Sequence, residues 1–140
     1  MAIHGVWKDG FFQMDGTDLS DHCREITLDM SLAELPDNVH GDNTAKVRAG
    51  LEDWTITVTF LQDFAAAKVD QSLQAKRTVG TASFNVIVGA DKTTAVSSTN
   101  PRYSGNAIMS SYSPMRGPHG TNLEATATFR AAGNLTRQTS

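Results

Sequence analysis

The residues best suited to bind a metal ion form one short acidic segment, Asp15-Gly16-Thr17-Asp18-Leu19-Ser20-Asp21. Its three carboxylates offer the hard oxygen ligands that calcium prefers. The spacing does not fit a calcium loop, because glycine stands at the second place and no glutamate follows as a bidentate ligand. An Asp-Gly turn between two strands explains the segment better, and no metal is expected here.

The histidines and the single cysteine form no catalytic or metal-binding pattern either. His4, His22, His40 and His119 lie far apart, each in or beside an expected turn, and Cys23 has no second cysteine to pair with. The sequence contains no His-Glu-x-x-His, no phosphate-binding glycine loop and no Gly-x-Ser-x-Gly elbow. These observations predict a protein that is not an enzyme and needs no metal or cofactor.

Length and hydropathy predict one soluble domain over residues 1–140. No apolar run approaches the roughly 18 residues of a membrane span. The first residues, Met1-Ala2-Ile3-His4-Gly5, lack the charged start and apolar stretch of an export signal. Contact with a membrane is therefore not expected.

The net charge of −3 is unevenly distributed along the chain. Residues 1–63 carry twelve acidic and four basic residues, a net −8, and the remainder carries three acidic and eight basic residues, a net +5. A nucleic-acid binder that used its whole surface would have a basic total. The division suits a protein whose partner is another copy of itself, although it is equally consistent with charges that mix on one surface.

Strict alternation of apolar and polar residues is the clearest structural signal, and it is typical of an antiparallel sheet packed on one face only. Turn residues such as Asp15-Gly16 and Pro114 end two weaker candidates. The four alternating segments are Glu25–Leu32, Trp54–Phe60, Ser83–Val88 and Asn122–Arg130, and the two weaker ones are Phe11–Met14 and Tyr103–Tyr112.

One helix is expected to interrupt the strands, at about residues 63–77. Asp63 suits its N-cap, and Gly80 lies just beyond its end. Its apolar stripe, which includes Val69 and Leu73, is short, so the helix should pack on a sheet. The fold class predicted is mainly β: an antiparallel β-sandwich or barrel-like sheet with one flanking α-helix.

Three segments show neither the alternation of a strand nor the apolar stripe of a helix and are expected to be loops: residues 33–51, 89–102 and 113–121. Loops of this length are uncommon in compact domains and usually serve a function or order on binding. The polar C-terminal tail, residues 131–140, is expected to be flexible in the isolated protein.

The order of these segments resembles the tail tube proteins of long, flexible-tailed (siphovirus-type) bacteriophages, a fold shared with type VI secretion tube proteins. The resemblance covers nearly the whole chain, and it rests on the order and spacing of motifs that are weak singly. These motifs are Asp15-Gly16-Thr17-Asp18-Leu19-Ser20, the strand Glu25–Leu32, the run Gly41-Asp42-Asn43-Thr44-Ala45-Lys46, the run Ala49-Gly50-Leu51-Glu52-Asp53, and the closing strand with Leu123–Phe129.

The resemblance implies a structural virion protein that forms stacked hexameric rings, and hence the hollow tube that delivers DNA to the host. The implied partners are other copies of the chain, a tape measure protein, and the distal tail and tail terminator proteins. DNA would pass without sequence-specific binding, and assembly would take place in the host cytoplasm. A type VI secretion-like tube protein and a small-ligand-binding β-sandwich are the alternatives.

Two polar strand faces cannot form core, and we expect them to line the lumen; the alternative is that they are external surface in contact with water. Carboxylates and hydroxyls there would let DNA slide, whereas a basic lumen would bind it. The expected lumen-facing residues are Glu25, Thr27, Asp29, Thr55, Thr57 and Thr59.

Contacts between copies are expected where the acidic segment Glu34–Asp42 meets basic residues of the second half. Reversing the charge of Asp37 and Asp42 should then impair tube formation. The full set of expected contact residues is Glu34, Asp37, Asn38, Asp42, Asn43, Lys46, Arg48, Arg102, Arg116 and Arg137.

Overall fold

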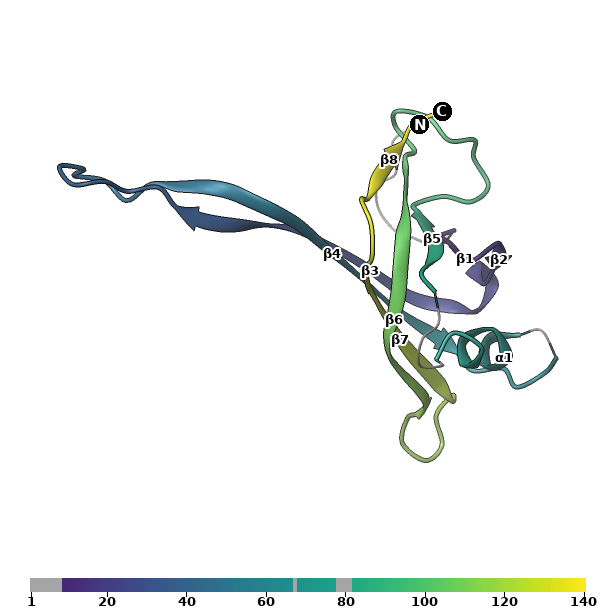
Figure 1. Cartoon of the computed structure of the whole chain (residues 1–140). Coiled ribbons are helices and arrows are strands. Elements are labelled where there is room, and N and C mark those ends of the chain that lie inside the picture. The colour runs from purple at the N-terminus through teal and green to yellow at the C-terminus, as the bar shows by residue number, and fades with distance from the viewer. Residues whose placement is uncertain (1–8, 67, 78–81) are drawn as a thin grey trace.

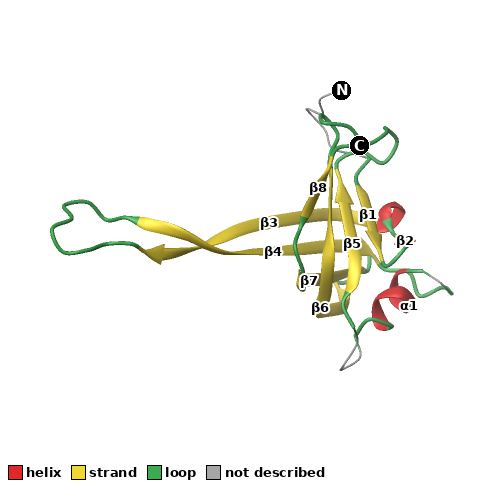
Figure 2. Cartoon of the chain, turned by 45° about the horizontal axis from the view of Figure 1, so that its top comes forward, coloured by secondary structure: helices red, strands yellow, loops and turns green. Residues whose placement is uncertain are grey.

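The computed structural model describes residues 9–66, 68–77 and 82–140 and shows one curled antiparallel sheet with one short α-helix beside it (Figures 1 and 2). The strand order is β2-β1-β5-β6-β7-β4-β3, and β8 also pairs with β6. This confirms the predicted fold class, and the sheet is not a closed barrel. The strands are β1 (Phe11–Met14), β2 (Thr17–Asp18), β3 (Cys23–Pro36), β4 (Val47–Leu61), β5 (Phe84–Gly89), β6 (Arg102–Arg116), β7 (Glu124–Ala131) and β8 (Thr136–Gln138).

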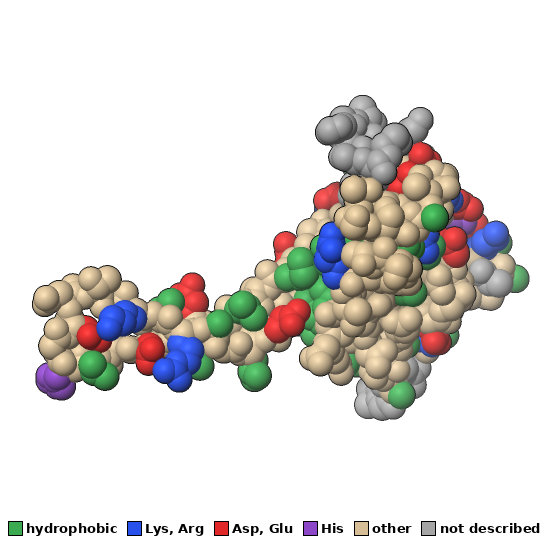
Figure 3. Space-filling model, turned by 90° about the horizontal axis from the view of Figure 1, so that it is seen from above, with side chains coloured by type: hydrophobic (Ala, Val, Ile, Leu, Met, Phe, Trp, Pro, Cys, Tyr) green, Lys and Arg blue, Asp and Glu red, His purple; other side chains and the backbone are tan. Residues whose placement is uncertain are grey.

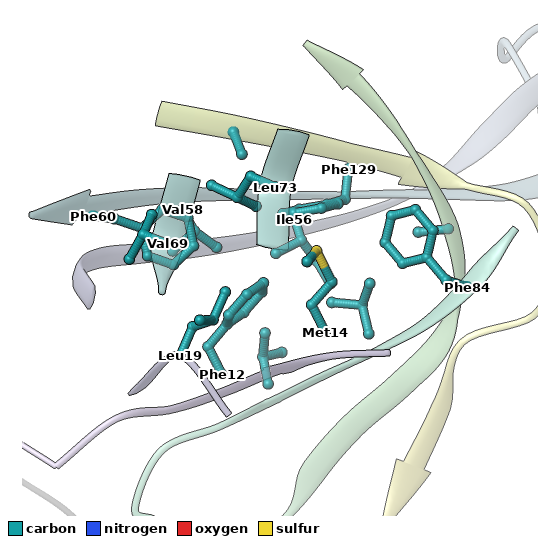
Figure 4. Close-up of a cluster of buried hydrophobic side chains, with 14 of the residues drawn as sticks. Phe12, Met14, Leu19, Ile56, Val58, Phe60, Val69, Leu73, Phe84 and Phe129 are labelled. Atoms are coloured by element: carbon teal, nitrogen blue, oxygen red, sulfur yellow. The ribbon is translucent and has the colours of Figure 1, made fainter. Parts of the chain in front are cut away.

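The core lies on one face of this sheet and is built from the alternating strands that the sequence predicts. Trp54, Ile56, Val58 and Phe60 of β4 are buried, while the threonines between them point to the other face. Phenylalanine side chains of several strands meet in the middle, and the rings of Phe12 and Phe60 lie edge to face at 5.6 Å. Figure 4 shows these side chains converging with those of the helix.

The acidic segment near the N-terminus forms the turn expected of it. Met14 pairs with Thr17, so Asp15 and Gly16 make a two-residue hairpin loop. Their φ values are +49° and +83°, as a type I′ turn requires. Asp18 then accepts hydrogen bonds from the backbone and hydroxyl of Ser20, which starts a short 3₁₀ turn, Ser20–His22.

The flanking helix α1 is regular only over Val69–Gln74, a shorter span than the expected 63–77. Val69 and Leu73 are fully buried against the sheet. Asp63 accepts a hydrogen bond from the N–H of Ala65, but it lies ahead of the helix and does not cap it. Gly80, the expected stop, and His4 lie outside the described residues.

Tyr112 of β6 ties the helix to the sheet. Its hydroxyl donates to Asp70 at 2.7 Å and accepts from Gln62 at 3.1 Å. Burial, with the hydrogen bond and charge of Asp70, raises the pKa of Tyr112 to about 12. The neutral phenol is therefore the form that the folded protein favours.

We expect this contact to make stability depend on alkaline pH. Tyrosine in the unfolded chain ionises near pH 10, below its folded pKa, so the stabilisation is complete below about pH 10 and is lost as pH rises through about 12. Urea unfolding at about pH 8 and about pH 11 should show a larger loss for the wild type than for Tyr112→Phe. Equal losses in both proteins would contradict the contact.

The C-terminal segment is held by Trp54. Its indole N–H donates to the carbonyl of Gly133 at 2.9 Å, and its ring packs on Gly105. A Cβ atom at Gly105 would lie 2.8 Å from that ring, so only glycine fits there. The tail, residues 131–140, then contributes strand β8 beside the first residues of β6, whereas the sequence suggested no strand in it; its flexibility stays a prediction.

The segment 33–51 is the main difference from the sequence-based expectation, because most of it is strand and not loop. β3 continues to Pro36 and β4 begins at Val47, so only residues 37–46 connect them. The two strands form a long hairpin that projects far from the rest of the chain (Figures 1 and 2). We call residues 32–52 of this hairpin the arm.

The segment between β5 and β6 is irregular, as expected, but it is internally bonded. Asn100 is 1% exposed, and its amide donates to the carbonyls of Asp91, Thr94 and Ala95. The loop therefore has a defined conformation in the single subunit. The third expected loop, 113–121, is shortened because β6 continues to Arg116. In the described ranges, no helix has the length and hydropathy to cross a membrane.

Candidate assembly surfaces

The face of the sheet opposite the core is polar across four adjacent strands, β6, β7, β4 and β3. The strand register places residues directly opposite one another in rows. One row is Thr27, Thr57, Thr128 and Ser111, and the row before it is Glu25, Thr59, Thr126 and Ser113. We call this surface the polar face.

All six residues expected to line a lumen share the polar face. Glu25 and Asp29 are exposed, whereas Thr59 is only 9% exposed. The structure adds residues from β6 and β7 that the sequence-based set omits, namely Ser111, Ser113, Thr126 and Thr128. The alternation of apolar and polar residues in 122–130 could have identified Thr126 and Thr128 as members of this face. Whether this face lines a lumen stays a prediction.

The charges of the polar face are mostly acidic, and its arginines have carboxylate neighbours. Arg130 donates to Asp53 at 3.0 Å, from β7 to the adjacent β4. Arg116 lies directly opposite Glu124 in the register, although its guanidinium contacts the Thr126 hydroxyl at 3.5 Å. The face thus presents mainly hydroxyls and carboxylates; Arg130 is paired with Asp53, and Arg116 contacts a hydroxyl.

Two edges of this four-stranded region have no partner strand in the described part of the chain. One is the outer edge of β3, which pairs only with β4. The other is the side of β6 beyond Ala107, because β5 pairs with β6 only over Arg102–Ala107 and β7 occupies the opposite side. Unpaired strand edges are ready templates for pairing with another chain.

The arm carries apolar side chains that sequence reasoning missed. Leu32, Leu35, Val39, Val47 and Leu51 are between 48% and 87% exposed. Figure 3 shows hydrophobic and charged side chains interspersed along the arm. Exposed apolar groups in this number on a projecting hairpin are typical of an interaction surface.

Seven of the expected contact residues lie on the arm, and several bond to one another. Asp37 pairs with Arg48 at 3.0 Å, and Asp42 pairs with Lys46 at 3.1 Å. The backbone N–H of Val39, followed by Lys46, lowers the pKa of Asp42. Charge reversal at Asp37 and Asp42 would therefore disturb the arm itself. The seven residues are Glu34, Asp37, Asn38, Asp42, Asn43, Lys46 and Arg48.

The three remaining expected contacts do not form one basic patch. Arg102 lies over the ring of Phe11 at 4.2 Å, and its Nε is buried without a hydrogen-bond partner among the described residues. Arg137 donates to the carbonyl of Ser98 at 3.3 Å. Arg116, at the end of β6, and Arg137 are exposed, whereas Arg102 is half-buried.

The acidic first half and basic second half meet within the subunit. Asp15 pairs with Lys76, Asp21 with Lys92, and Asp53 with Arg130. Folding therefore partly neutralises the charge division along the sequence.

A polar cleft of about 340 Å³ lies at the beginning of β3. Its lining includes Asp9, Asp21, Cys23, Glu25 and Lys92. Burial raises the pKa of Cys23 to about 12, so its thiol, which donates to the Leu19 carbonyl, is not a nucleophile at neutral pH. No metal-binding cluster of histidine, cysteine or carboxylate occurs in the residues that the structure describes.

No protein-family model and no curated protein matches the chain, but solved structures do. A chain from the tail of an empty gene transfer agent (GTA) particle with C6 symmetry aligns with a TM-score of 0.75 and 14% identity, over 98% of this chain and 100% of that one. A chain of the PVC extracellular contractile injection system's sheath/tube terminator aligns with a TM-score of 0.73 and 10% identity, over 97% of each chain. The SPP1 tail tube aligns with a TM-score of 0.70 and 12% identity, over 94% of this chain and 76% of that one. The chain therefore has the fold of phage tail tube proteins and of related injection-system tube proteins.

Proposed function

We propose that this protein is the structural subunit of a phage-type tail tube, in which hexameric rings stack into a hollow conduit for DNA. The observation that carries the proposal is the four-stranded region with one polar face and two unpaired edges. The C6 symmetry of the GTA tail supports six copies in each ring.

Strand directions support ring closure. All neighbouring strands in the order β6-β7-β4-β3 are antiparallel, so β3 runs opposite to β6. A rotated copy would present its β6 edge antiparallel to this β3 edge. If every copy paired its β3 edge with the β6 edge of the next, no strand edge in the ring would remain unpaired. Closed barrels remove unpaired edges in the same way.

Closure also determines which face would line the channel. The core, with side chains of α1, β1 and β5, lies on one face of the four strands, while hydroxyls and carboxylates make up the other. The bulk of each subunit would thus lie outside the barrel, and Thr27, Thr57 and Thr128 would face inward. Hydroxyls and carboxylates there would not hold DNA phosphates as a basic surface does.

The arm would provide contacts beyond the ring. It projects past the body of the subunit and exposes Leu35, Val39, Val47 and Leu51. Docking of the arm on a neighbouring copy would remove these side chains from water. In this role the protein is a non-enzymatic virion component, made in the host cytoplasm, whose other partners are tape measure, distal tail and terminator proteins.

A second candidate function is a tube of a contractile injection system. The similarity to the PVC sheath/tube terminator supports it, because its TM-score of 0.73 is close to that of the GTA tail chain. The two functions share ring formation and differ in cargo.

Sedimentation velocity and negative-stain microscopy of the purified protein test the proposal. Rings or tubes of uniform width are expected as the concentration rises. A strict monomer at high concentration, even with tail initiation proteins present, would refute both tube functions.

Positive charge on the polar face is expected to make the tube retain DNA. In the double variant Thr27→Lys/Thr128→Lys, a labelled duplex should sediment with the tubes at low salt, while wild-type tubes leave it in solution. The dependence of log affinity on log salt should steepen by about 0.9 for each lysine that contacts a phosphate. The matched control, Asn85→Lys/Gln138→Lys, adds the same charge on β5 and β8, outside the four strands of the polar face, and equal retention by the control would contradict the assignment.

A further inference from the structure

We propose that Arg116 of one subunit enters the cleft at the beginning of β3 of the next copy and pairs there with Glu25. This inference rests on the proposed ring and names the side chains that hold its copies together.

The cleft lies where a neighbouring strand would arrive. Cys23, Arg24, Glu25 and Ile26 of the unpaired β3 edge line it together with Asp9, Asp21 and Lys92. Lys92 is bonded to Asp21. None of the described cations forms an ion pair with Glu25, which is exposed, so its carboxylate can accept a partner from outside.

The polarity of the strands brings the end of β6 to this cleft. The beginning of β3 lies at the same end of the four-stranded region as the end of β6, because Glu25 pairs with Thr59, Thr59 with Thr126, and Thr126 with Ser113. Rotation about a ring axis keeps this end common to all copies. The last residues of a neighbour's β6 therefore meet the first residues of β3.

Arg116 is the cation that this edge offers. It is the one charged residue in Ile108–Arg116, the stretch of β6 without a partner strand on its outer side. Arg116 and Glu25 both lie on the polar face, so their side chains would meet on the same side of the joined sheet. A guanidinium suits a carboxylate because its fork can donate two parallel hydrogen bonds.

The pair cannot form within one subunit. Strands β4 and β7 lie between β3 and β6 in the sheet, and strands are spaced about 4.8 Å apart. Any energetic coupling between Glu25 and Arg116 must therefore arise between copies.

Charge exchange tests this pair. Arg116→Glu and Glu25→Arg, each alone, should keep the circular dichroism and melting temperature of the wild type and lose ring formation by sedimentation. The double variant Glu25→Arg/Arg116→Glu should recover rings. Mixing the two single variants should also give rings, because alternating copies place an opposite charge at every Glu25–Arg116 contact. Arg77→Glu, an exposed arginine beside α1, is the matched control and should assemble normally.

Normal rings from Arg116→Glu alone would overturn the inference, and so would failure of both the double variant and the mixture. Absence of rings from the wild type would refute the proposed function and this pair with it. Rings from the wild type and from all single variants would refute the Glu25–Arg116 pair and leave the proposed function standing.

Discussion

Removal of the arm is expected to leave a folded subunit that forms no tubes. Leu32 pairs with Glu52 across the hairpin, so residues 33–51 can be replaced by Asn-Gly, which favours the two-residue turn between such partners. None of the buried core residues belongs to the deleted segment. Circular dichroism and thermal melting should match the wild type, whereas electron microscopy should show no tubes.

A variant of unchanged length serves as the control for this deletion. Replacing Leu35, Val39, Val47 and Leu51 with serine keeps the backbone of the arm and removes its exposed apolar groups. It should weaken tube formation in the same direction, because burial of these side chains supplies the contact. Normal tubes from the deletion variant would contradict the role of the arm.

Of the substitutions proposed for this protein, Phe129→Ala is expected to cause the largest loss in the free energy of unfolding. Phe129 of β7 is fully buried, with its ring 5.7 Å from that of Phe12 and 5.9 Å from that of Phe84. Truncation of a buried phenylalanine costs about 3–5 kcal/mol. Whole domains are stable by only about 5–15 kcal/mol, so this is a large fraction.

Urea unfolding measures that loss directly. Phe64→Ala is the matched control, since Phe64 is 49% exposed and lies outside the core; its change should stay within about 0.5 kcal/mol. A loss at Phe129 no larger than at Phe64 would contradict the central position of this ring in the core.

The sequence predicted the elements that bury one face. In β4 and β7 the alternation of apolar and polar residues coincides with the alternation of buried and half-buried side chains, from Trp54 to Phe60 and from Ala125 to Phe129, with Thr59 as the exception at 9% exposure. The same alternation placed the six candidate lumen residues on the polar faces of two separate strands, and the register of β3 and β4 joins them on one face.

The arm could not be predicted in the same way. Both of its faces are exposed, so apolar residues such as Leu35 and Leu51 follow no period of two. A register irregularity between Leu32 and Glu34 breaks the pattern further. Gly50 fits there because a Cβ atom would lie 3.0 Å from that of Ala33, and in the sequence this glycine reads as a loop residue.

The bounds of the helix and the roles of the expected contact residues could not be predicted, because both depend on tertiary contacts. The alanines after Asp63 favour a helix locally, yet the regular helix begins at Val69, where side chains reach the core. Asp37 and Asp42 find partners within the arm, and only the strand order reveals that Glu25 and Arg116 occupy opposite unpaired edges.

Cryo-electron microscopy of assembled tubes tests the central claim most directly. The map should show six subunits per ring, a continuous antiparallel barrel joining β3 of one copy to β6 of the next, and Thr27, Thr57 and Thr128 facing the channel. A map with the polar face on the outside of the tube, or with β3 unpaired between copies, would contradict it.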